Sequence, residues 1–205
     1  MKKNLQIGKQ IALALILLVT ATVVNAQTRT ATTDGPWNST TTWGGASVPT
    51  SVNDVVINNG IDVTVPADAA CNSITFGSAA GSISVNSGFT LAVTGAITLQ
   101  NAATGNRAAT LTGAGTLTCA SIVVGGTTLA PNLTGDGLTT LTCTVAVVSV
   151  SGNISLRGVD DGADDNDPSF ILNSGSLTVS GTVVLNEDAG SAVTFNLNGG
   201  GAATG

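Results

Sequence analysis

Three equal blocks of sequence, 71–94, 95–118 and 119–142, can be laid over one another in the middle of this chain. Each block opens with Cys or Gly, continues with an aliphatic stretch and closes on Thr. Cys71 and Cys119 open the first and third blocks, and Cys143 stands where a fourth would begin. A repeat of about 24 residues is typical of solenoid proteins, in which each repeat forms one coil and packs against its neighbours.

A second pattern has an Asn-x-Gly element near its start. Ile57–Val65 recurs as Val85–Val93 and, one position shorter, as Leu172–Val179. Within the blocks apolar residues alternate with small polar ones, which is the period of a strand with one buried face. The sequence therefore predicts an all-β parallel β-helix with three short strands per coil. We expect the Asn-x-Gly elements to form one corner, with Gly at positive φ, and the opening Cys or Gly to form another.

The N-terminus is typical of a secretory signal peptide. Met-Lys-Lys is followed by the apolar stretch Ile11–Val19 and by small residues ending at Ala26, so we expect cleavage there and a protein that is secreted or at the cell surface. The apolar stretch is too short to span a membrane, and no second one follows. The mature chain is therefore expected to lack a transmembrane span.

The remaining chain divides into a cap segment at 27–52 and β-helix repeats at 53–205, with an acidic loop insertion at 158–168. The last residues, Gly-Gly-Gly-Ala-Ala-Thr-Gly205, do not resemble a cap. An uncovered last coil exposes a sheet edge. We therefore expect either a longer protein, of which this is the first part, or self-association through the open C-terminal coil.

Composition excludes several function classes. Without the signal peptide the chain keeps three arginines against twelve carboxylates, a net charge of −9, and it has no His. Such a chain has no basic patch for nucleic acid phosphates, and with 3% aromatic residues it has little to stack on bases. With one Glu and no His the options for acid-base catalysis are few, so we predict no enzyme activity.

Five aspartates cluster inside the predicted insertion, namely Asp160, Asp161, Asp164, Asp165 and Asp167. Carboxylate oxygens on a Gly-containing loop suit Ca²⁺, although the spacing does not match an EF-hand. A solvated acidic loop explains the same residues. Calcium is the only cofactor that the sequence suggests.

The cysteines are predicted to stack along the helix axis, with Cys119 and Cys143 one coil apart and Cys71 two coils from Cys119. A disulfide between Cys119 and Cys143 is compatible with that spacing. A row of reduced, buried thiols is the alternative.

Threonines form a predicted outward ladder at Thr94, Thr116, Thr118, Thr140 and Thr142. Flat Thr-x-Thr arrays resemble the ice-binding faces of β-helical antifreeze proteins, and ice binding is therefore one alternative function. Outward Thr is also a common residue of ordinary strands.

Trp37 and Trp43 precede the repeats, where they can stack on sugar rings or cover the end of the first coil.

The segment 35–50, with Trp37, Trp43-Gly-Gly and Pro49, followed by Asn53-Asp-Val-Val-Ile57, resembles the start of large secreted surface proteins of Bacteroidota and similar autotransporter passengers. The resemblance covers residues 35 to about 100 and implies an adhesin-like β-solenoid. Its implied partners are extracellular glycans or neighbouring surface proteins. A carbohydrate-binding or polysaccharide-degrading β-helix protein is the alternative from another class.

Overall fold

We describe the chain from a computed structural model that covers residues 27–77, 81–100, 106–126, 137–160, 165–187, 191–198 and 203–204. These residues form strands and turns, and none of them lies in a helix. Sheet A contains β1 (Arg29–Ala31), β3 (Asp54–Ile57), β5 (Ala69–Cys71), β6 (Ser73–Phe76), β8 (Thr90–Leu99), β10 (Thr116–Gly125), β12 (Val147–Val150), β13 (Ile154–Arg157), β16 (Ser176–Val179), β17 (Val183–Asn186) and β19 (Ala203–Thr204). Sheet B contains β2 (Gly35–Pro36), β4 (Asp62–Val65), β7 (Gly81–Val85), β9 (Arg107–Thr112), β11 (Gly137–Cys143), β14 (Val159–Asp160), β15 (Asp165–Leu172) and β18 (Thr194–Leu197).

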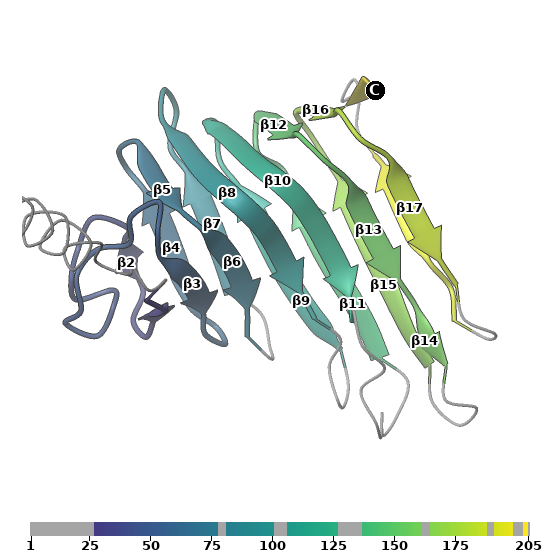
Figure 1. Cartoon of the computed structure of the whole chain (residues 1–205), viewed down its shortest axis with the longest axis horizontal. Coiled ribbons are helices and arrows are strands. Elements are labelled where there is room, and N and C mark those ends of the chain that lie inside the picture. The colour runs from purple at the N-terminus through teal and green to yellow at the C-terminus, as the bar shows by residue number, and fades with distance from the viewer. Residues whose placement is uncertain are drawn as a thin grey trace, which may run out of the picture.

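The strands stack in parallel from the N-terminal end of the molecule to the C-terminal end (Figure 1). Only the short pairing of β14 with β15 is antiparallel among the described strands. Each strand pairs with the equivalent strand of the next coil, as β4 does with β7 and β7 with β9. The predicted all-β parallel solenoid is confirmed.

Sheet A is bent and consists of two columns. Column A1 contains β5, the first half of β8, the first half of β10, β12, β16 and β19. Column A2 contains β1, β3, β6, the second halves of β8 and β10, β13 and β17. The pairing of β8 with β10 shifts register at the bend, between Cys119 and Ser121. Each coil therefore runs from A1 to A2, crosses to sheet B and returns to A1, giving the three strands per coil that the sequence predicts.

Alternate side chains of every column point into a single hydrophobic core. In column A1, for example, Leu91 and Val93 lie beside Leu117 and Cys119, and all four are at most 4% exposed. A lone coil has no second layer for these side chains, so stacking supplies the burial that drives folding.

Asx side chains fasten one coil to the next at the strand starts. The Oδ1 atom of Asp68 accepts a hydrogen bond from the Thr90 N–H at 2.8 Å, and that of Asn106 accepts one from the Leu138 N–H at 2.9 Å. In the same way, Asn153 Oδ1 accepts a hydrogen bond from the Thr182 N–H at 3.0 Å. These bonds satisfy amide groups at the ends of the ladders, where strand pairing stops.

Coil length varies more than a fixed repeat predicts. Asp54 and its register partner Ser73 differ by 19 in sequence number, whereas the partners Ile122 and Ile154 differ by 32. The repeat also places Gly95 beside the cysteines, whereas Cys71 and Cys119 both pair with Val93. Blocks cut at a fixed interval therefore drift out of register.

The length differences fall mainly at one edge, where column A2 connects to sheet B. The connections there comprise residues 58–61, 77–80, 100–106, 126–136, 158–164, which includes the short strand β14, and 187–193. The single insertion predicted at 158–168 is thus one of several, and it is shorter than predicted because Asp165 to Pro168 belong to β15.

The Asn-x-Gly elements do supply positive φ, at Gly60, Gly88 and Gly175. They do not form one corner, however. Gly60 lies between β3 and β4, on the way from A2 to sheet B, whereas Gly88 and Gly175 lie between sheet B and A1. The same local turn serves two corners because a tight reversal needs the same backbone conformation at either place.

The segment 27–52 carries two strands of the ladder, since β1 pairs with β3 and β2 with β4. Trp37 and Trp43 follow, each 2% exposed, with their rings edge to face at 5.0 Å. The Trp43 indole donates to the Trp37 carbonyl at 2.7 Å.

The predicted signal peptide, residues 1–26, lies outside the described residues. Among the residues that the structure describes, no helix is long and apolar enough to cross a membrane.

Candidate functional site

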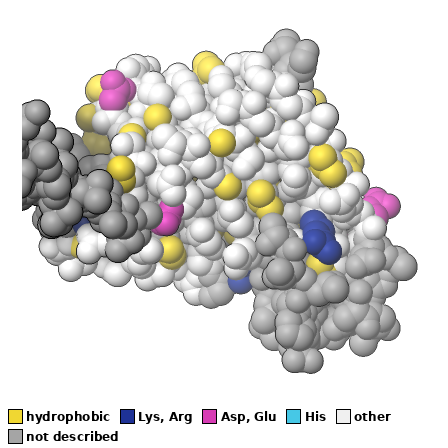
Figure 2. All heavy atoms as spheres, in the orientation of Figure 1, with side chains coloured by type: hydrophobic (Ala, Val, Ile, Leu, Met, Phe, Trp, Pro, Cys, Tyr) yellow, Lys and Arg dark blue, Asp and Glu magenta, His cyan; other side chains and the backbone are white. Residues whose placement is uncertain are grey.

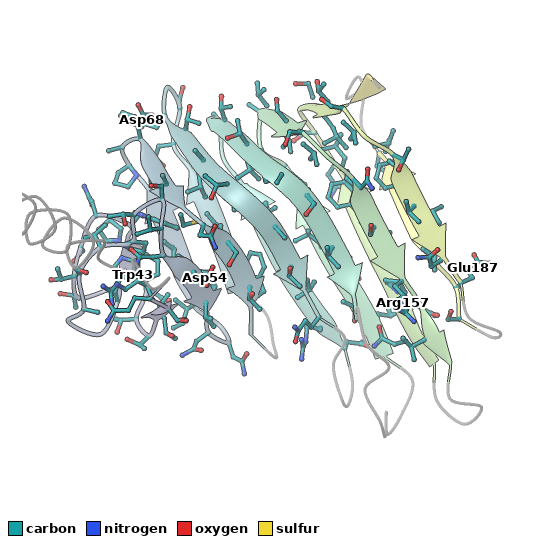
Figure 3. All side chains as sticks on the ribbon, in the orientation of Figure 1. Trp43, Asp54, Asp68, Arg157 and Glu187 are labelled. Carbon is teal, nitrogen blue, oxygen red and sulfur yellow. The ribbon has the colours of Figure 1, made fainter. Side chains whose placement is uncertain are left out.

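Charged side chains are sparse on the surface. The face in Figure 2 is mostly uncharged, with isolated hydrophobic side chains and few Asp, Glu or Arg. Asp54, Asp68 and Glu187 lie in separate parts of the fold (Figure 3). Within the described ranges no three His, Cys, Asp or Glu side chains come together in a group suited to a metal.

The described aspartate side chains instead bond to the protein itself. Asp54 accepts hydrogen bonds from the Asn72 amide at 2.8 Å and the Ser73 hydroxyl at 2.5 Å. Asp62 accepts one from Ser82 at 2.6 Å. Like Asp68, these residues join neighbouring coils, which is a structural use of a carboxylate.

Of the five aspartates considered for calcium, only Asp167 has a described side chain. Its Oδ1 accepts a hydrogen bond from the Ala192 N–H at 2.7 Å, again between coils. Asp160 pairs with Asp165 through the backbone of β14 and β15, while Asp161 and Asp164 lie outside the described residues. Calcium binding stays a prediction.

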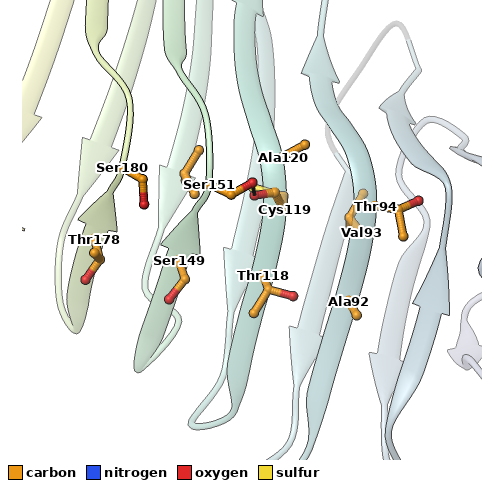
Figure 4. Close-up of a pocket in the computed structure, with 11 residues that line it drawn as sticks. Ala92, Val93, Thr94, Thr118, Cys119, Ala120, Ser149, Ser151, Thr178 and Ser180 are labelled. Carbon is orange, nitrogen blue, oxygen red and sulfur yellow. Dashed lines mark hydrogen bonds between the residues drawn. The ribbon is translucent and has the colours of Figure 1, made fainter. Parts of the chain in front are cut away.

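A groove of about 390 Å³ is hollowed into sheet A along the bend between columns A1 and A2 (Figure 4). It crosses neighbouring coils, because its walls come from β8, β10, β12 and β16 and the residues that follow them. The lining residues are all small, and comprise Ala92, Val93, Thr94, Thr118, Cys119, Ala120, Ser149, Val150, Ser151, Thr178 and Ser180. The groove therefore has the shape of a shallow trough along the solenoid axis.

Close packing at the bend also requires glycine beside the groove. A Cβ on Gly95 would lie 2.8 Å from the Asn72 carbonyl oxygen, and one on Gly152 would lie 2.7 Å from that of Ala120. Gly181 is equally restricted, at 2.5 Å from the Gly152 carbonyl oxygen. Each coil thus turns over the backbone of the coil before it, and no bulky side chain fills the concave side.

The chemistry of the groove is neutral. Its lining contains hydroxyl and aliphatic groups and the Cys119 thiol, and it contains no carboxylate, amine or guanidinium. Hydroxyls at the bend bond to the protein itself: Thr94 Oγ1 lies 3.2 Å from Asn72 Oδ1, and Ser151 Oγ lies 3.4 Å from the Cys119 carbonyl oxygen. A serine without an adjacent base is a weak nucleophile. The arrangement suits holding an uncharged surface and supplies no acid-base pair.

The predicted threonine ladder is divided between two faces. Thr116 and Thr118 lie in column A1, next to Thr90 and Ala92 on one side and Val147 and Ser149 on the other. Thr140 and Thr142 lie in sheet B, so their placement on the same array is wrong. Thr94 lies at the bend itself, where the register is interrupted.

Sheet B carries a different hydroxyl array. Thr110 pairs with Thr142, and Ser82 pairs with Thr110. One row along, the Thr144 hydroxyl donates to that of Thr112 at 2.9 Å. Thr-x-Thr pairs therefore do stack in adjacent coils, but on sheet B and with Thr144 in place of Thr140.

The cysteines do not form one row. Cys71 and Cys119 both pair with Val93 in column A1, so they lie two coils apart, as predicted. Cys143 lies in sheet B beside Leu111 and Leu172, so the predicted stacking of Cys143 on Cys119 is wrong. All three thiols are free and buried.

Burial makes the thiols unreactive. Desolvation, with a smaller contribution from Asp54, raises the pKa of Cys71 to about 12. Desolvation, with a smaller contribution from Cys143, raises the pKa of Cys119 to about 12, and burial raises the pKa of Cys143 to about 11. The thiolate is the reactive form, so these cysteines are not candidates for nucleophiles.

We therefore predict that a thiol reagent at pH 8 leaves the folded protein unmodified and labels all three cysteines in denaturant. Because folding raises these pKa values from 9.0, the thiols stabilise the fold fully below pH 9 and lose that effect as pH rises toward 11 to 12. Mass spectrometry after alkylation measures the first result, and urea unfolding across that pH range measures the second. Rapid labelling of the folded chain would contradict the buried placement.

Trp37 and Trp43 are too buried to offer a ring face to a sugar. Within the described part of the chain their contacts are those of packing residues at the N-terminal end of the core.

Comparison with known proteins adds no functional assignment: no protein-family model matches the chain, and no curated protein or solved structure matches it significantly.

Proposed function

We propose that this protein is a secreted or cell-surface β-solenoid with a structural and adhesive role and without a catalytic centre. Its groove on sheet A would hold an extended, uncharged partner, and a linear neutral glycan is the partner class that we favour. The neutral groove carries this proposal. An extended partner suits a trough that crosses several coils, and a neutral one suits walls without charge.

The lining also favours binding over cleavage. Glycosidases of the common type need two carboxylates flanking the scissile bond, separated by about 5 to 10 Å. No Asp or Glu belongs to the groove lining, and the described carboxylates near the bend, such as Asp54, are bonded to the next coil. A neutral glycan would therefore be held by hydroxyl contacts and left intact.

The substitution Thr118→Arg tests the groove. Thr118 is a half-buried outward residue of β10 in the groove wall, so a guanidinium there fills the trough without entering the core. We expect glycan affinity to fall by roughly tenfold or more, because the loss of several contacts exceeds about 1.4 kcal/mol. Screening on a glycan array finds the ligand, and titration calorimetry compares the variant with the parent.

Thr112→Arg is the matched control, since Thr112 is a half-buried outward residue of β9 on sheet B. Both variants should keep the circular dichroism spectrum of the parent. Equal loss of glycan binding in the two variants would rule out the groove as the site. Cleavage of a bound glycan would refute the assignment as a non-enzyme.

Ice binding is a second candidate, favoured by the stacked pairs Thr110-x-Thr112 and Thr142-x-Thr144 on sheet B. Here the roles of the two variants reverse. Thr112→Arg should abolish thermal hysteresis and Thr118→Arg should retain it. No thermal hysteresis in the parent at high protein concentration would eliminate this candidate.

A further inference from the structure

Polar side chains are buried along one edge of the core, where column A2 connects to sheet B. Arg107 and Thr139 belong to β9 and β11, Asn166 belongs to β15, and Ser191 precedes β18. Their exposed fractions are 8%, 0%, 2% and 7%. The only other buried polar residues in the described part are Thr42 and Asn53, near the N-terminal end. The hydrophobic core thus has a polar margin at the edge where coil length varies.

Arg107 is the buried cation of this margin. Its Nη1 donates to the Gln100 carbonyl at 2.5 Å, whereas its buried Nε–H has no acceptor. Thr139 is its register partner in β11, and the Thr139 hydroxyl donates to Asn166 Oδ1 at 2.8 Å. Desolvation lowers the pKa of Arg107. A carboxylate paired with the guanidinium would instead raise its pKa, because a nearby anion favours the charged form.

A buried guanidinium with an unsatisfied N–H is strongly unfavourable unless an anion meets it. We propose that Arg107 anchors a binding site for an oxyanion, either a carboxylate or a sulfate group. The planar guanidinium binds such groups through parallel N–H bonds. The contact of Nη1 with Gln100 fixes its orientation, and the buried Nε–H is the donor that lacks an acceptor. The site lies at the edge between A2 and sheet B, away from the groove at the bend between A1 and A2, and does not rest on the proposed function.

Two sources carry this chemistry, namely a free inorganic ion and the acid group of a sugar. The chain contains only three arginines, Arg29, Arg107 and Arg157, so an NMR spectrum of the arginine Nε–H groups resolves the site directly. Arg107→Lys assigns the Arg107 resonance by its disappearance. We would titrate the full chain with sulfate, with galacturonate and with galactose as the neutral control, all at constant ionic strength.

We expect the Arg107 Nε–H resonance to shift and saturate with sulfate or galacturonate and to stay in place with galactose. Saturation by sulfate identifies a free-ion site, and saturation by galacturonate alone identifies an acid-sugar site. Sulfate also stabilises proteins in general, so its effect on Tm is compared between the parent and Arg107→Gln. We expect the parent to gain about 3 °C more than the variant at roughly ten times the Kd.

A resonance that neither anion moves would overturn the proposal, even if Arg107→Gln fails to fold, because that titration uses the parent chain. An internal partner would also overturn it. Asp136 is the acid nearest in sequence to Thr139, and it lies outside the described residues. If Asp136→Asn shifts the Arg107 resonance and abolishes the anion response, the guanidinium is paired within the chain.

Discussion

Gly113→Ala is expected to destabilise the protein by about 3 to 5 kcal/mol, through backbone strain together with overpacking. Gly113 has φ +110, and a Cβ there would lie 2.1 Å from the Val85 carbonyl oxygen and 2.7 Å from the Val85 nitrogen. The neighbouring backbone cannot easily move away. The Gly115 N–H donates to the same Val85 carbonyl at 3.0 Å, and the Gly113 carbonyl accepts from Ala146 at 3.0 Å.

Gly88→Ala is the matched control. Gly88 occupies the equivalent connection between sheet B and A1 one coil earlier, with φ +83, and an added Cβ would meet nothing within 4 Å. Only the left-handed backbone then opposes alanine, at about 1 to 2 kcal/mol. Urea unfolding curves with equal slopes give the two values. Equal losses would mean that the coils are not in contact at Gly113 as the fold requires.

Much of the fold follows from the sequence because burial acts on every second residue. Pairs such as Leu91-x-Val93 and Leu117-x-Cys119 predict strands with one inward face, and these residues are buried together. Gly60, Gly88 and Gly175 likewise mark turns, since each needs a backbone conformation that other residues avoid.

The stacking of one coil on another does not follow in the same way. It depends on how many residues each connection holds, and connections such as 126–136 tolerate many lengths because loop closure costs little more as a loop grows. Thr118 and Thr142 close successive blocks of the repeat, yet they occupy different sheets. A fixed interval therefore located strands correctly and assigned several of them to the wrong neighbours.

The groove was missed for the same reason. Its outward residues Ala92, Thr118 and Ser149 become neighbours only when the buried pairs are aligned, Leu91 and Val93 with Leu117 and Cys119 and with Val148 and Val150. An alignment on aliphatic-x-aliphatic pairs would have found it. The buried Arg107 gave no such signal, because a charged residue at a strand start normally indicates exposure.

Phe170→Ala should be as damaging as the glycine substitution. Phe170 is fully buried in β15, pairs with Leu141 and stacks on Phe195 of the last coil at 5.4 Å between ring centroids. Removing a buried phenylalanine ring costs about 3 to 5 kcal/mol, through lost transfer energy and the cavity that remains. For a chain of this size the Tm should fall by roughly 10 °C. Calorimetry gives the global value.

The stacking on Phe195 adds a local consequence. β18 pairs only with β15 in the described part of sheet B, and Leu197 in it is 42% exposed, so little else holds this strand. In the Phe170→Ala variant, hydrogen exchange should therefore accelerate more in β18 than in β9, which lies two coils from Phe170. Ile171→Ala, at the half-buried outward neighbour, is the control and should cost about 1 kcal/mol or less. Uniform acceleration in every strand would indicate a single cooperative unit and would contradict a solenoid in which each coil relies mainly on its neighbours.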